Sequence, residues 1–85
     1  MPPVTSVKSM IGHSMGAASA LGAIASALAL EDQFIPPTVN FRQGDPDCPV
    51  DCVPNTSRDA ELTVVENHGF AFGGNNAVLL LERLP

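Results

Sequence analysis

The stretch from Ser9 to Leu30 carries no formal charge over 22 residues, and no other feature of the sequence restricts the fold as strongly. An uncharged stretch of this length is long enough to cross a bilayer. It is, however, rich in Ala, Ser and Gly, contains a histidine and has no flanking basic cluster, so few side chains favour its transfer into lipid. We therefore expect a long helix buried inside a protein.

The predicted helix should begin near Ser14, and the run Glu31, Asp32 and Gln33 should end it at the surface. One side carries Ala17, Leu21, Ile24 and Leu28, and a neighbouring side carries Gly16, Ala20, Ala23 and Ala27. A helix without a polar side needs protein around it. Glycine inside a helix costs about 1 kcal/mol relative to alanine, so Gly16 and Gly22 indicate close packing against another backbone.

The composition indicates that part of the surface normally meets more protein. Hydrophobic residues make up 45% of the 85 residues and charged residues only 15%. A chain of this size buries about 60–65% of its unfolded surface, which is too little to enclose the helix. The net charge of −5, with four basic residues against nine acidic ones, excludes a phosphate-neutralising face and therefore disfavours nucleic-acid binding.

The remaining segments predict an α/β chain. We expect a short strand or extended segment over residues 4–11 and a Pro- and Asp-rich surface loop over residues 42–59. Residues 61–67 and 77–84 have strand character, and the Gly- and Phe-rich residues 68–76 lie between them. This order predicts an antiparallel hairpin with a wide loop.

The pentapeptide GHSMG fits two kinds of site. In one, G-x-S-x-G places a nucleophilic serine, here Ser14, on a turn between a strand and a helix. A hydrolase triad would then be completed by Asp45 or Asp47 and by His68. Against this hypothesis, 85 residues cannot supply the long parallel sheet of an α/β-hydrolase, and no HGGG-type oxyanion segment is present.

In the other kind of site, the reactive residue is His13. It precedes the predicted helix, where unpaired N–H groups and the helix dipole favour a neutral imidazole over an imidazolium. Such a ring can donate one N–H to a developing oxyanion. Lys8 lies five residues earlier, toward the same end of the helix. Spacing alone leaves open the alternative that His13 is only a polar cap and Lys8 only a surface charge.

A second motif, NHGFAFGGNNA, covers residues 67–77. Phe70 and Phe72 alternate, which predicts a shared face if both lie in a strand. Gly73 and Gly74 permit a tight turn with positive φ or a close approach to a ligand. The motif is compatible with the wall of a binding site and equally with an ordinary hairpin.

The cysteines do not predict a metal centre. Cys48 and Cys52 form a C-x3-C pair, whereas a zinc site needs about four ligands at suitable spacing. Adding His13 and His68 would bring the number of candidate ligands to four, but their spacing does not indicate a zinc site, so we expect no metal. The first residues lack the pattern of a signal peptide, and we interpret the cysteines as two reduced thiols in a loop.

Four segments, in matching order over nearly the whole chain, together resemble the C-terminal end of the β-ketoacyl-[acyl-carrier-protein] synthases, which are condensing enzymes with the thiolase fold. The segments are VKSMIGHSMGAASA, similar to K-S-x-x-G-H-x-x-G-A; ALALEDQFIPPTVNF, similar to the stretch after it; DPDCPVDCVPN, similar to D-P-x-C-x-x-x-x-V-P-N; and NHGFAFGGNNAVLLLE, similar to N-S-F-G-F-G-G-x-N-A. The resemblance implies the C-terminal part of a thiolase-like layered αβα fold.

The resemblance also implies roles for individual residues. His13 would donate a hydrogen bond to the malonyl thioester oxygen while carbon dioxide leaves, and Lys8 would help to organise the other histidine of the site. Ser14 would be a helix-start residue and no nucleophile. The family's nucleophilic cysteine and first histidine belong to earlier segments that are not among these 85 residues.

In the hairpin, the resemblance makes Phe72 the gating residue, with its backbone N–H near the oxyanion hole, and makes Phe70 a lining residue of the same region. Gly73 and Asn76 would support the loop. This reading requires His13 and Phe72 to face one cavity. His68 departs from the family pattern, because the family usually has asparagine there in an ungapped alignment.

The implied protein is a cytoplasmic acyltransferase without a cofactor. It would catalyse a decarboxylative Claisen condensation with malonyl-acyl carrier protein in fatty acid or polyketide synthesis. Its partners would be acyl carrier protein, the remainder of the ketosynthase and a second subunit in a homodimer or heterodimer. Residues 1–85 would form the C-terminal segment of the ketosynthase domain and would be inactive alone. A non-catalytic partner subunit of the chain-length-factor type is the alternative, although retention of Lys8 and His13 favours the catalytic one.

Overall fold

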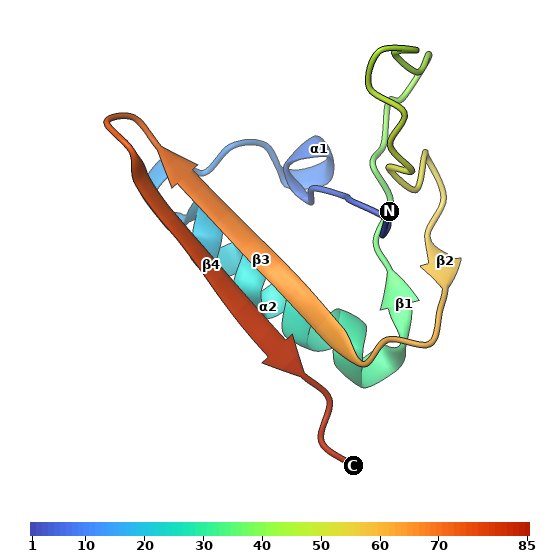
Figure 1. The fold of residues 1–85 in the computed structure, drawn as a ribbon, viewed down its shortest axis with the longest axis vertical. Helices are drawn as coiled ribbons and strands as arrows, with labels where there is room; N and C mark the ends of the chain where they lie inside the picture. The colour runs from blue at the N-terminus through green and yellow to red at the C-terminus, as the bar shows by residue number, and fades with distance from the viewer.

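The computed structural model describes residues 1–85 and consists of a long helix lying along one face of a β-hairpin, with a loop-rich excursion beside them (Figure 1). In chain order the elements are α1 (Lys8–Ile11), the 3₁₀ helix η1 (Met15–Ala17), α2 (Ala18–Asp32), β1 (Phe34–Ile35), β2 (Arg58–Asp59), β3 (Val64–Ala71) and β4 (Asn75–Glu82). The short strands β1 and β2 pair antiparallel, and so do β3 and β4.

The hairpin is confirmed, but its connection is tighter than predicted. The pairing of β3 with β4 runs from Val64 opposite Glu82 to Ala71 opposite Asn75, so three residues connect the strands. Gly73 and Gly74 both have φ +83°, a region that glycine enters without a steric penalty. Because these two glycines turn the chain at once, the strands extend through residues that the sequence assigned to the loop.

The prediction of an extended segment over residues 4–11 is wrong in its second half, where α1 forms a single helical turn. The Ser6 hydroxyl oxygen accepts a hydrogen bond from the Lys8 N–H at 3.3 Å, and the Ser9 hydroxyl donates to the Ser6 carbonyl at 3.2 Å. Such local bonds from serine compete with an extended backbone. Gly12, with φ +81°, ends the turn. Val4 lies outside any helix or strand, and its N–H donates to the Asp51 carbonyl at 2.9 Å.

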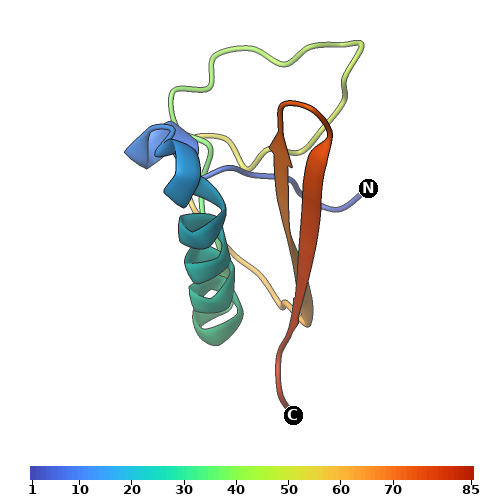
Figure 2. The same cartoon turned by 90° about the vertical axis from the view of Figure 1, so that its left-hand side faces the viewer.

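The long helix is present at the predicted position, but little of it is buried within this chain. Together η1 and α2 run from Met15 to Asp32, and Gln33 ends the helix in the left-handed region with φ +55°. Its buried residues are Ala29 and Leu30, whereas Ile24 and Leu28 are 57% and 47% exposed. This exposure agrees with the expectation that 85 residues cannot enclose the helix, because the hairpin covers only one side of α2 (Figure 2).

The close packing expected at the helix glycines occurs at Gly22. A β-carbon there would lie 2.6 Å from Asn67 Oδ1 in β3, and a β-carbon at Gly69 would lie 2.5 Å from Ser19 Oγ. The Asn67 amide also donates to the Ser19 carbonyl at 3.0 Å. Around Gly16 there is open space, so nothing in this chain explains that glycine. These contacts hold the start of α2 against the second half of β3.

This contact predicts that Gly22→Ala has different effects on stability in two backgrounds. With Asn67 present, the new methyl group displaces the Asn67 side chain from its bond to Ser19, and the loss of that bond offsets the gain of about 1 kcal/mol in helix propensity. With Asn67→Ala, the gain remains and Gly22→Ala stabilises. A double-mutant cycle on the thermal unfolding of a ketosynthase that carries this segment measures the coupling. Additive effects of the two substitutions would contradict the contact.

Gln33 closes the base of the excursion, residues 34–59, with both its backbone and its side chain. Its Nε2 donates to the Leu30 carbonyl at 2.7 Å and to the Leu62 carbonyl at 3.0 Å, while its Oε1 accepts from the Leu62 N–H at 2.8 Å. The Gln33 carbonyl accepts from the Ala60 N–H at 3.1 Å. The end of α2 and the approach to β3 are therefore tied together.

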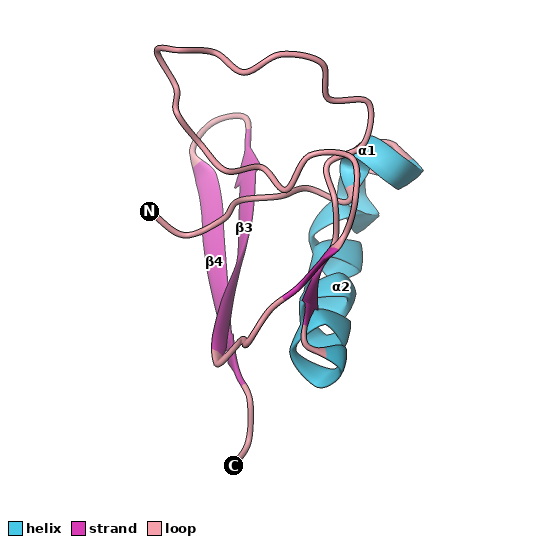
Figure 3. Ribbon diagram, turned by 90° about the vertical axis from the view of Figure 1, so that its right-hand side faces the viewer, coloured by secondary structure: helices cyan, strands magenta, loops and turns pink.

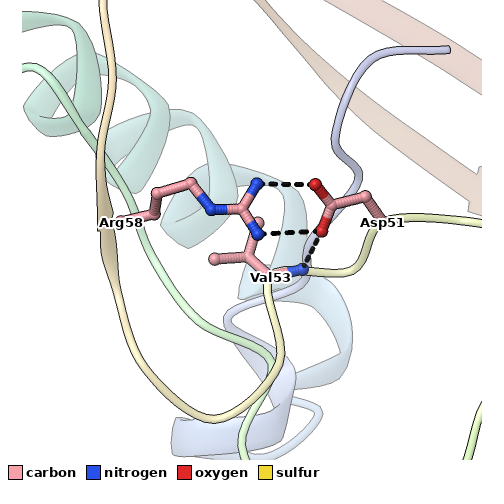
Figure 4. A network of polar contacts seen from close by, with 3 residues as sticks. All are labelled: Asp51, Val53 and Arg58. Carbon is pink, nitrogen blue, oxygen red and sulfur yellow. Dashed lines mark hydrogen bonds and ion pairs between the residues drawn. The ribbon is translucent and has the colours of Figure 1, made fainter.

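The excursion is almost entirely loop (Figure 3), as its proline content predicts, but it is not purely superficial. Val53 is only 1% exposed, which makes it the most buried residue of the chain. Its carbonyl accepts from the Thr38 N–H at 2.9 Å, and its own N–H donates to Asp51 Oδ1 at 3.0 Å. Arg58 donates to both oxygens of the same carboxylate (Figure 4). Val53 thus lies at the centre of the folded excursion.

We expect Asp51→Asn to reduce thermal stability at neutral pH and to have progressively less effect in acid. Hydrogen bonds from Arg58 and from the Val53 N–H lower the pKa of Asp51 below its ordinary value of 3.8. The carboxylate therefore contributes stability above about pH 4, and this contribution is lost as the pH falls through the lower folded pKa. Unfolding temperatures measured from pH 7 to pH 3 check this. The matched control is Asp47→Asn, because the Asp47 carboxylate forms no ion pair. An equal effect of both variants would contradict the stabilising role of the Asp51 carboxylate.

Candidate active site

His13 lies in the turn between α1 and η1, and its ring is held by the backbone. Gly12 directs the chain into this turn with φ +81°, and Met15 follows with φ +54°. The Met15 N–H donates to His13 Nδ1 at 3.1 Å. A ring nitrogen that accepts a hydrogen bond carries no hydrogen, so the neutral ring has its hydrogen on Nε2. The ring is exposed, and Nε2–H has no partner within the chain.

His13 directly precedes Ser14, the N-cap of η1. The N–H groups at the start of η1 and α2 lack partners within the helix and give this end positive potential. Lys8, the first residue of α1, is exposed, and its ammonium forms no ion pair. The predicted donor and the predicted lysine therefore flank one short turn of chain.

The two phenylalanines of the second motif occupy different kinds of position. Phe70 lies in β3 and is 70% exposed, whereas Phe72 lies in the three-residue turn and is fully exposed. The strand ends at Ala71, so the alternation that predicted a shared face stops before Phe72. Residues 65, 67 and 69 of β3 are less exposed than their neighbours, because they face α2. Phe70 therefore points to the opposite face of the hairpin.

The His13 turn and the Phe72 turn lie at the same end of the molecule. In Figure 1 and in Figure 2, the chain entering α2 lies beside the hairpin end that bears the β3–β4 turn. The contact of Ser19 with Gly69 fixes this arrangement, since Ser19 is six residues after His13 and Gly69 is three residues before Phe72. The packing of α2 on β3 thus brings the two motifs to one region.

The turn is braced by a residue that the sequence did not single out. Asn75 Nδ2 donates to the Phe72 carbonyl at 3.3 Å across the turn. Asn76, the predicted support, pairs with Phe70 in the ladder, and Gly73 provides the positive φ. Only the register of the hairpin distinguishes the two asparagines, because both belong to the same motif.

The C-terminal domain model of the β-ketoacyl synthases matches residues 1–42. The chain is 51% identical over 81 residues to the "Oxytetracycline polyketide putative beta-ketoacyl synthase 1" of Streptomyces rimosus, and this alignment covers 94% of the chain and 19% of that protein. It superposes on the structure of "The ishigamide ketosynthase/chain length factor" with a TM-score of 0.95 and 60% identity, covering 99% of this chain and 21% of the other. The chain belongs to the β-ketoacyl synthase family.

This β-ketoacyl synthase segment is also similar to a protein named as a 3-oxoacyl-[acyl-carrier-protein] synthase. It is 44% identical over 81 residues to the "3-oxoacyl-[acyl-carrier-protein] synthase 2" of Coxiella burnetii, covering 95% of the chain and 20% of that protein. The chain spans about a fifth of the length of the relatives that it matches. The resemblance on which the sequence analysis relied is therefore confirmed, and it places the chain in the C-terminal region of the family.

The β-ketoacyl synthase segment does not assemble the hydrolase triad. His68 Nε2 lies 2.8 Å from Glu66 Oε2, and neither Asp45 nor Asp47 contacts the ring. The loop that bears both aspartates lies on the other side of the molecule from the β3–β4 turn (Figure 1). Ser14 forms no side-chain hydrogen bond.

The cysteines of the segment are not part of this region. Cys48 is exposed and Cys52 is half-buried, and both are free thiols in the excursion. No three residues of the His, Cys, Asp and Glu types gather as metal ligands. No helix has the length and apolar character needed to cross a bilayer.

Proposed function

We propose that this segment forms the His13 half of the active site of a β-ketoacyl synthase that condenses an acyl thioester with malonyl-acyl carrier protein. Residues 1–85 form the C-terminal part of the ketosynthase domain in this proposal. The observation that carries it is the hydrogen bond from the Met15 N–H to His13 Nδ1. That bond leaves the remaining ring hydrogen on Nε2, exposed and without a partner, which is the state a neutral oxyanion donor requires.

In the proposed reaction, the bond between C2 of the malonyl group and its carboxylate breaks and carbon dioxide leaves. The electron pair moves into the thioester, which becomes an enolate with negative charge on its oxygen. His13 Nε2–H donates to that oxygen, and a preorganised donor of this kind contributes about 3–4 kcal/mol to transition-state stabilisation. The enolate carbon then attacks the acyl thioester carbonyl, a new carbon–carbon bond forms, and the thiolate that held the acyl group departs.

The other site residues take supporting roles in this proposal. Lys8 helps to organise the first histidine of the site, which another segment supplies. Phe72 gates the access of the acyl chain, with its backbone N–H near the oxyanion hole, and Phe70 lines the same region. Gly73 and Asn76 keep the turn in shape. The full exposure of Phe72 in the isolated segment is compatible with a ring that moves or packs on another part of the enzyme.

The nucleophile in this proposal comes from another segment, since Cys48 and Cys52 lie in the excursion. The enzyme is a cytoplasmic acyltransferase of fatty acid or polyketide synthesis and needs no cofactor. It works with acyl carrier protein and pairs with a second subunit of the same or another kind. A relative whose printed name joins a ketosynthase with a chain length factor supports the heterodimeric form.

The proposal is tested with the protein that carries this segment, incubated with malonyl-acyl carrier protein and an acyl donor. Release of carbon dioxide together with a β-ketoacyl product is the expected result. Labelling of Ser14 by a fluorophosphonate without release of carbon dioxide would overturn it in favour of a hydrolase. Absence of both would indicate a non-catalytic subunit of the chain-length-factor type.

A further inference from the structure

A row of three side chains lies on the hairpin face that points away from α2. Glu66, His68 and Phe70 alternate along β3 at the more exposed positions, so all three project from the same face. His68 Nε2 lies 2.8 Å from Glu66 Oε2. The His68 and Phe70 rings meet edge to face, with centroids 5.7 Å apart and planes at 85°. We call Glu66, His68 and Phe70 the outer row.

The chemistry of the outer row fixes the orientation of each member. An ionised carboxylate can only accept, so the bond to Glu66 places a hydrogen on His68 Nε2. That bond restrains the imidazole plane. The edge-to-face geometry with Phe70 is a favoured arrangement of aromatic rings, and the imidazole is the one ring that contacts Phe70.

No other charged group competes for His68 within the hairpin. The residues opposite the outer row in β4 are Leu80, Val78 and Asn76, all uncharged. Phe70 is the member nearest to the β3–β4 turn, two residues before Phe72. The row therefore extends from a carboxylate anchor to the ring beside the proposed acyl gate.

We propose that Glu66 and His68 are positioning residues that hold the Phe70 ring and thereby set which acyl chain lengths the enzyme accepts. This inference rests on the proposed function, because it assumes that Phe70 lines the path of the acyl chain. His68 acts on the substrate only through Phe70. Removal of either anchor should therefore change the selectivity for acyl chains and leave malonyl decarboxylation unchanged.

The test uses the full ketosynthase that carries this segment. The ratio of kcat/KM for decanoyl over butyryl donors is measured for His68→Ala, Glu66→Ala and the double variant, together with malonyl decarboxylation and the unfolding temperature. Each variant should shift the ratio by about two- to tenfold, the range that corresponds to one aromatic pair. The double variant should shift it no further than His68→Ala alone, because both act through one ring.

Two further variants control for stability and charge. Glu66→Gln keeps an accepting oxygen and should leave the ratio within about twofold of the wild type, which a purely structural role would not require. Glu82→Ala removes a carboxylate from the same face, opposite Val64 and outside the outer row, and should leave the ratio unchanged.

An unchanged ratio in His68→Ala and Glu66→Ala, with decarboxylation intact, would overturn this inference alone. An equal shift in Glu82→Ala would attribute the effect to charge and would also overturn it. If the alanine variants do not fold, a shifted ratio in Glu66→Gln with an unchanged unfolding temperature would contradict the anchoring bond. A wild-type protein that releases no carbon dioxide would refute the proposed function and this inference with it.

Discussion

Replacing His13 by alanine in the ketosynthase that carries this segment is expected to lower the rate of malonyl decarboxylation by about 10²–10³-fold. The Met15 N–H occupies Nδ1, so Nε2–H is the one hydrogen that the neutral ring can offer to an oxyanion. Loss of one such preorganised donor typically reduces kcat by this factor. Release of carbon dioxide from labelled malonyl-acyl carrier protein measures the effect without requiring the condensation step.

The neighbouring residue supplies the matched control. Ser14→Ala alters a side chain that forms no hydrogen bond, so decarboxylation should remain near the wild-type rate. His13→Gln keeps an N–H donor on a side chain of similar length and should recover part of the activity. Full activity in His13→Ala would refute the assigned role. Inactivity of Ser14→Ala with an intact His13 would instead support the hydrolase hypothesis.

The second large effect is expected at Val53, where substitution by threonine keeps the shape and buries a hydroxyl group. Val53 is 1% exposed, and a buried hydroxyl without a partner costs about 1–3 kcal/mol in proteins. The Thr38 N–H donates to the Val53 carbonyl, so opening of the excursion exposes that amide to solvent. A loss of about 2 kcal/mol corresponds to roughly 30-fold faster hydrogen exchange at Thr38.

Val4→Thr is the control for this change, because the same substitution is made at a residue that is 53% exposed and joined to the excursion through the Asp51 carbonyl. Exchange at Thr38 should be unchanged in this variant. If Val53→Thr also leaves the exchange unchanged, Val53 does not hold the excursion together and the packing described above is incorrect.

The elements that the sequence predicted correctly are those specified by the backbone freedom of glycine or by a long periodic pattern of side chains. The period of small and apolar residues predicted the helix, and Gly73 and Gly74 predicted the turn. The helical turn at Lys8 was missed because it depends on side-chain bonds of Ser6 and Ser9 that have no periodic signal. The burial of Val53 was missed because a single apolar residue among prolines and aspartates does not reveal that the loop folds back on itself.

In the candidate site, too, some features could be predicted from the sequence and others could not. The K-S-x-x-G-H motif made His13 a candidate, but the motif does not show which ring nitrogen accepts the Met15 N–H. The pairing of Glu66 with His68 could not be foreseen, since it requires both residues to lie in one strand, whereas the strand was predicted to end at residue 67, before His68. Register and tautomer follow from three-dimensional contacts and have no counterpart in spacing.

The hydrogen bonds of Gln33 join the two ends of the excursion beside the helix and the hairpin. The residue joins the end of α2 to Leu62 and Ala60, so the 26 intervening positions of the excursion begin and end at one fixed point. We therefore expect a change of chain length near Gly44 to alter the outline of the loop more than the packing of α2 on the hairpin. The spacing between the histidine and the phenylalanine turns would then be preserved.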